Sequence, residues 1–206
     1  MKSANISNKF GGIKYKFIDG LNNNKKACFC IIIVCLIGVL TGVFTAINYC
    51  NGQSLINFND YSICKFISGQ LGTLDLFFSR FFSYTLVLTI IWVSSLSVYL
   101  FPVSLFVLAY RGYLLSLNVS IMIILYGVNG IVTGVFVILP VHLVGLILLS
   151  CFACYCFKKA YLKSRFGSCN FNLWDKYLIF LLLLTILNLI ETLLLTIFSG
   201  KSILVI

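Results

Sequence analysis

The chain has 206 residues, of which 61% are hydrophobic and only 10% are charged, and its mean hydropathy is +1.07. These values exclude an ordinary soluble globular domain and leave no room for a sizeable soluble enzyme domain. The formal net charge is +10. We expect the basic residues to mark membrane topology and not nucleic-acid binding, because the basic runs lack interleaved aromatic residues.

The first 80 residues are predicted to form a tail, a membrane helix and an outer segment. Residues 1–26 are polar and basic, which favours a cytoplasmic tail. Residues 27–47 form the first predicted span, in which Gly38 and Gly42 have the spacing that lets two helices approach closely. Apolar residues recur near helical spacing in residues 49–80, which favours an amphipathic helix on the outer membrane surface. An extended loop is the alternative for this segment, since glycines interrupt it.

Residues 82–157 are the apolar centre of the chain. Only Arg111 and His142 can carry a positive charge there, and the block contains no carboxylate. Backbone polar groups in lipid must be hydrogen-bonded internally, so we expect this block to be helical. Because it starts outside and ends at the inner basic residues, it must cross the membrane an odd number of times. The predicted helices are near 82–110, 112–126 and 131–157.

This division assigns a role to each helix breaker of the block. Pro102 kinks the first helix, Arg111 and Gly112 form the cytoplasmic turn, and residues 127–130 form the outer turn. Residues 112–126 are short for a helix that crosses the whole membrane, and the sequence leaves open whether this helix crosses completely. A second division breaks the chain at Phe101-Pro102 and buries Arg111 inside the membrane. We rank it lower because a buried charge is costly.

The C-terminal part is predicted to hold one more span. Residues 158–176 form a basic inner loop, residues 177–199 the last helix and residues 200–206 a short outer tail. The predicted fold class is therefore all-α: one polytopic membrane domain over residues 27–199. It has about five transmembrane helices, with the N-terminus inside and the C-terminus outside.

The sequence lacks the usual catalytic and cofactor motifs. A single His and a single Glu exclude an HExxH zinc site, and no GxSxG elbow or glycine-rich nucleotide loop is present. We therefore predict no catalytic residue, no cofactor and no metal. Cys151, Cys154 and Cys156 fit packing better than metal binding, because no further ligands complete a set. Cys50 and Cys64 both fall on the outer side, and whether they pair is left open.

Polar residues within the predicted helices are the candidates for function. His142 and Glu191 lie well inside their helices, and Asn188 shares a face with Glu191. The three side chains could form one cluster, either as an interhelical hydrogen bond that fixes packing or as part of a proton or ion path. Arg111 is predicted to extend its charged end to the interface. Pro140 frees the carbonyl of residue 136 and kinks or breaks its helix.

Several features follow one another along the chain in an order that is similar to that in the stage II sporulation protein M family of bacterial membrane proteins. These features are Trp92 in a span, Phe101-Pro102, Arg111-Gly112, Tyr126-Gly127-Val128-Asn129-Gly130, Ile138-Leu139-Pro140 and a lone Glu191 in the last helix. The similarity extends from the first span to the last.

The resemblance implies a non-enzymatic scaffold in the bacterial plasma membrane. Such a scaffold would recruit or localise peptidoglycan-remodelling enzymes during forespore engulfment. The expected partners are the lipid bilayer and membrane-associated peptidoglycan hydrolases, with a homo-oligomer as an option and no nucleic acid. The alternative is a small transporter or permease subunit with a polar pathway near His142 and Glu191. An intramembrane hydrolase ranks third.

Overall fold

A computed structural model describes residues 25–51, 71–166 and 173–200. Within them the chain is helical and contains no strand. The long helices are α2 (Lys25–Asn51), α4 (Thr73–Ser94), α5 (Phe101–Thr133), α6 (Leu139–Phe166) and α7 (Trp174–Gly200). Short helical segments cover Val98–Leu100 and Gly134–Ile138. Five segments of this part are long and apolar enough to cross a membrane. The all-α prediction and the number of membrane-length helices are thereby confirmed, as in a multi-pass membrane protein.

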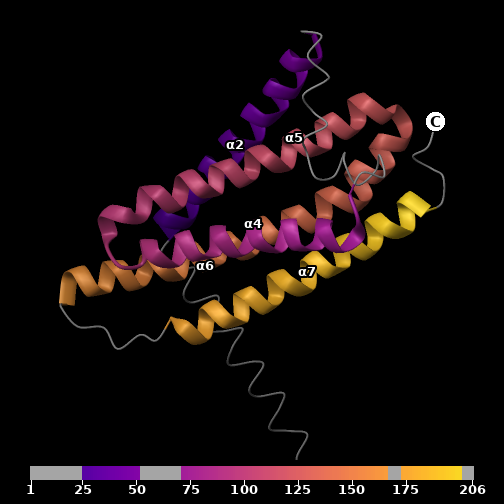
Figure 1. Ribbon diagram of the computed structural model, residues 1–206. Helices are drawn as coiled ribbons and strands as arrows, with labels where there is room; N and C mark the ends of the chain where they lie inside the picture. Colours follow the sequence, from indigo (N-terminus) through magenta and orange to yellow (C-terminus); the bar gives the residue numbers. More distant parts are fainter. Residues whose placement is uncertain (1–24, 52–70, 167–172, 201–206) are drawn as a thin grey trace, which may run out of the picture.

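The helices alternate in direction along the chain (Figure 1). The hydroxyls of Thr89 on α4 and Tyr177 on α7 lie 3.1 Å apart, and the ring centroids of Trp92 and Trp174 are 4.8 Å apart. The end of α4 therefore lies beside the start of α7. α5 turns back into α6 at Gly127, whose φ of 55° is a conformation that favours glycine.

The division of the central block predicted above is wrong, and the second division describes the fold. The chain breaks at residues 95–100, and Arg111 and Gly112 lie inside α5. Residues 112–126 continue this helix and are not a separate one. Pro102 occupies the first turn of α5, where its missing N–H costs nothing, so it begins a helix and does not kink one. The predicted reversal at Gly127 is found.

Two predicted segments outside the central block also change. Residues 73–80 form the first turns of α4 and not a separate surface helix, and residues 52–70 of that prediction lie outside the described residues. The basic segment 158–176 is largely helical, because α6 continues to Phe166 and α7 begins at Trp174. Residues 1–24 and 201–206, with Cys64, also lie outside the described part.

Glycines bring α2 and α5 into close contact, as the spacing of Gly38 and Gly42 allows. A Cβ atom on Gly38 would overlap the carbonyl oxygen of Ala109, and one on Gly42 would overlap the Ser116 hydroxyl. Gly112 makes the corresponding close contact from α5, because a Cβ atom added to it would lie 2.7 Å from the Cys35 carbonyl oxygen. Such backbone approach is how helices associate in lipid, where hydrophobic burial gives no driving force between them.

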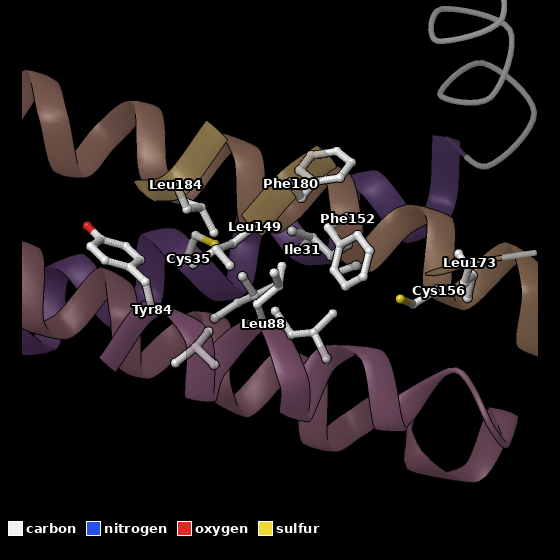
Figure 2. Close-up of a cluster of buried hydrophobic side chains, with 14 residues drawn as sticks. Ile31, Cys35, Tyr84, Leu88, Leu149, Phe152, Cys156, Leu173, Phe180 and Leu184 are labelled. Atoms are coloured by element: carbon white, nitrogen blue, oxygen red, sulfur yellow. The ribbon is translucent and has the colours of Figure 1, made fainter. Parts of the chain in front are cut away.

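The main core gathers side chains from all five long helices. Figure 2 shows Ile31 of α2, Leu88 of α4, Leu149 and Phe152 of α6, and Phe180 of α7 turned toward one another. The ring centroids of Phe152 and Phe180 are 5.2 Å apart. Close packing of this kind supplies the dispersion energy that replaces the hydrophobic effect inside a bilayer.

The lysines of the described residues lie at one end of the bundle, which we call the lysine end. α2 begins with Lys25 and Lys26, α6 carries its lysines in its last turns, and α7 has Lys176 in its first turn. The contacts between α2 and α6 and between α4 and α7 place these helix ends together. Trp92, Trp174 and Tyr177 lie at the same end, and such amphipathic rings prefer the edge of a membrane.

Candidate functional site

Helical spacing turns a set of polar side chains toward the centre of the bundle. On α4, residues at intervals of three or four are buried, and Arg80 and Tyr84 fall on this face together with Leu76 and Leu88. α7 presents Asn188 and Glu191 in the same way. The polar cluster, as we call it, consists of Arg80, Ser83 and Tyr84 of α4, Arg111 of α5, His142 of α6, and Asn188 and Glu191 of α7.

His142 is the centre of this cluster. Its Nε2 lies 3.1 Å from Oε1 of Glu191, and its Nδ1 lies 3.1 Å from the Tyr84 hydroxyl. We assign a proton to Nε2, which faces the carboxylate, and let Nδ1 accept the hydrogen bond from Tyr84. Nη1 of Arg80 lies 3.4 Å from Nε2. The result is a Tyr–His–Glu chain with a guanidinium beside it.

Arg111 is buried and does not extend to the interface, so this prediction is wrong. Its side chain is 7% exposed. Nη2 donates a hydrogen bond to the Ser83 hydroxyl at 2.9 Å, and the guanidinium carbon lies 4.5 Å from the centre of the Tyr84 ring. The hydrogen bond and the cation–π contact offset part of the cost of burying the charge. That cost was the reason for ranking the correct helix division second.

Asn188 joins α7 to α4 and not to His142. Its Nδ2 donates a hydrogen bond to the Phe77 carbonyl oxygen at 3.0 Å, while the Thr192 hydroxyl donates to the Asn188 carbonyl oxygen at 2.8 Å. The structure thus brings two of the three predicted polar residues, His142 and Glu191, into direct contact. Asn188 joins α7 to α4 about one turn before Glu191.

The charges of the cluster are unequal. Two guanidinium groups, of Arg80 and Arg111, share a buried environment with one carboxylate, that of Glu191, which is 1% exposed. Five buried atoms have no hydrogen-bond partner among the described residues: Arg80 Nε, Arg111 Nε, Asn188 Oδ1 and both carboxylate oxygens of Glu191. Of these, Oε1 of Glu191 has the ion-pair contact with His142. Electrostatic attraction is strong in such a low-dielectric environment, so Glu191 is the group on which neutralisation of the cluster depends.

The other predicted site residues lie in structural positions. Trp92 packs against Trp174 at the lysine end, Pro102 starts α5 and Gly112 contacts α2. Gly127 and Gly130 form the reversal into α6, where a Cβ on Gly130 would overlap the Met122 carbonyl oxygen. Pro140 follows a π-helical turn over Gly134–Ile138, in which the N–H of Leu139 bonds to Gly134. The helix therefore absorbs the proline by widening and does not break.

The arrangement can clamp helices together and can pass a proton along the Tyr–His–Glu chain. A cavity of about 10 Å³ beside Tyr84, also lined by Thr85 and Thr185, is about the size of one water molecule. Within the described residues no group of three His, Cys, Asp or Glu side chains could hold a metal ion. No family model, no curated protein and no solved structure matches the chain.

Proposed function

We propose that the chain is a non-enzymatic membrane scaffold of the bacterial plasma membrane. In this role it holds peptidoglycan-remodelling enzymes in place during forespore engulfment, the role implied by its resemblance to the stage II sporulation protein M family. The observation that carries the proposal is the polar cluster. Its polar side chains contact one another or the backbone across α4, α5, α6 and α7, and such a network fixes the relative positions of the helices.

The lysine end supports the orientation that this role needs. Lysines flanking membrane helices stay on the cytoplasmic side, so α2 and α7 begin in the cytoplasm. The N-terminus is then inside and the C-terminus outside. The end of α2, the start of α4 and the reversal at Gly127 then face the cell wall, where partner enzymes act. The exposed apolar faces of α4 and α7 meet lipid, membrane anchors of partners, or a second copy.

The experiment is purification in mild detergent from the cells that make the protein, followed by a cleavage assay on purified peptidoglycan. We expect cleavage activity to co-elute with the wild-type protein and to be absent when the chain is produced alone. The protein produced alone should also insert and assemble. An eluate without cleavage activity, or cleavage by the isolated chain, would contradict the scaffold.

One observation favours a transporter as the second candidate. The π-helical turn of Gly134–Ile138 lies just before His142, and irregular helices beside buried ionisable groups are common in transport pathways. The unpartnered atoms of Arg80, Arg111 and Glu191 would then serve a substrate or ion. Purified protein in sealed vesicles separates the two candidates. A transporter dissipates an ion gradient and loses this activity in a folded Glu191→Gln variant, whereas a scaffold leaves the gradient intact.

A further inference from the structure

An apolar groove runs along the outside of the bundle between α2 and α6. It has a volume of about 540 Å³. Its walls include Ile32 and Leu36 of α2, Leu115 of α5, and Leu143, Ile147 and Cys151 of α6. Ser150 contributes the one hydroxyl among the lining side chains. The groove therefore offers almost nothing that forms hydrogen bonds.

The groove lies at the depth of the hydrocarbon. Ile32 is 57% exposed and Ile147 is 52% exposed, so the groove opens sideways and not into the bundle. Both α2 and α6 belong to the membrane-length segments. An empty space in this position would forfeit the dispersion contacts of every lining side chain. Apolar matter must therefore fill it.

The lysine end supplies a charge at one end of the groove. Along α6, the lining residues recur at helical spacing down to Cys154. At the same spacing, Lys158 and Tyr161 follow one and two turns later on this face. Lys163 lies on the opposite face of the same helix. A cation and an amphipathic ring thus stand where the groove meets the membrane surface.

We propose that the groove is a binding site for an anionic phospholipid, with an acyl chain between α2 and α6 and the headgroup at Lys158. The groove face of α6 from Leu139 to Cys154 is about 22 Å long at the helical rise. Half of the hydrocarbon core is about 15 Å, so the groove accommodates an acyl chain that enters from the lysine end. This inference goes beyond the scaffold and does not depend on it.

A lipid fits this groove better than a partner helix does. Helices dock in membranes where small residues let the backbones approach. The two glycines of α2 that could serve this purpose, Gly38 and Gly42, already contact α5. The groove walls instead carry branched side chains and no glycine. A flexible acyl chain can follow such walls, and the lysine prefers a phosphate to an uncharged partner.

The test is native mass spectrometry of the protein released from nanodiscs that contain equal parts of phosphatidylglycerol and phosphatidylcholine. We expect wild-type protein to retain phosphatidylglycerol in preference. Lys158→Gln should lower the ratio of the two retained lipids about fivefold, the effect of one lysine at an anionic surface. Lys163→Gln is the matched control, with the same charge change on the opposite face, and should leave the ratio unchanged. Ile147→Trp fills the groove and should reduce retention of both lipids.

Three results would overturn the proposal. Equal effects of Lys158→Gln and Lys163→Gln would mean that the basic surface attracts lipid without a site. Unchanged retention in Ile147→Trp would mean that no acyl chain occupies the groove. A wild-type dimer that Ile147→Trp converts to a monomer would assign the groove to a second copy.

Discussion

Replacement of Glu191 by glutamine tests the polar cluster most sharply. The change keeps the size of the side chain and removes the carboxylate charge that faces Arg80 and Arg111. The amide oxygen of the glutamine can still accept a hydrogen bond from Nε2 of His142, which lies 3.1 Å from Oε1 of Glu191, so the change removes the charge and keeps an acceptor. Two buried guanidinium groups are then left without an acid in the cluster, and Glu191→Gln should destabilise the bundle strongly.

Two interpretations of the cluster differ in magnitude. Loss of one partner from a buried ion pair costs about 3–5 kcal/mol, because the remaining charge is uncompensated. An ordinary interhelical hydrogen bond in a membrane contributes only about 0.6 kcal/mol, with a maximum near 1.7. We therefore expect the free energy of unfolding to fall by about 3 kcal/mol or more. A loss below about 1 kcal/mol would reduce His142–Glu191 to a simple hydrogen bond.

The chain contains its own reporter for this measurement. It has two tryptophans, and the rings of Trp92 and Trp174 lie 4.8 Å apart across α4 and α7. Tryptophan fluorescence during titration with a denaturing detergent therefore reports when these helices separate. Circular dichroism of the same samples shows whether the variant is folded before the titration begins.

A second substitution isolates the charge. Arg80→Met in the Glu191→Gln background returns the net charge of the cluster to its wild-type value, so it should recover part of the lost stability. Lys163→Met in that background is the control, since it removes a charge outside the cluster and should recover nothing. If the double variant is less stable than the Glu191→Gln protein, Glu191 does not act by balancing the charge of the cluster.

Four further substitutions test the packing of the bundle in the same assay. Gly38→Ala should destabilise it by about 1–3 kcal/mol, because the new methyl group meets α5 backbone. Gly134→Ala, whose Cβ would make only ordinary van der Waals contacts with Val119 and Met122, should be neutral or slightly stabilising. Asn188→Leu should cost about 1 kcal/mol through the lost bond to Phe77, and a cost above 3 would make it part of the charge network. Gly127→Ala should cost about 1–3 kcal/mol through backbone strain at φ 55°, and an unchanged stability would contradict this reversal.

The sequence was sufficient to predict the helical class, the number of membrane-length helices and the reversal at Gly127. The predicted helix boundaries within the central block were wrong at Pro102. In the middle of an apolar run, a proline can kink a helix or start one, and the choice depended on the assumed cost of burying Arg111. The sequence does not show that Ser83 and Tyr84 of another helix receive this arginine. The position of this helix boundary therefore depends on contacts between helices that the sequence does not show.

The site was predicted in part for a similar reason. His142 and Glu191 were identified because ionisable residues deep inside apolar helices are conspicuous. Arg80 was missed because it was assigned to an outer segment. Its spacing from Leu76, Tyr84 and Leu88, all on one face of a helix, is the signal that would have placed it in the bundle. Sequence spacing places Asn188 on the correct face of α7. It does not predict the hydrogen bond of Asn188 to a backbone carbonyl on α4.

Amine labelling of intact cells tests the membrane topology directly. A membrane-impermeant reagent is added either to intact cells or to opened membranes, and the peptides that contain Lys158, Lys159 and Lys163 are quantified by mass spectrometry. A five-helix membrane bundle with its lysine end in the cytoplasm predicts labelling of these lysines only after the membranes are opened. Equal labelling in intact cells would place the lysine end outside and contradict both the orientation and the scaffold facing the wall.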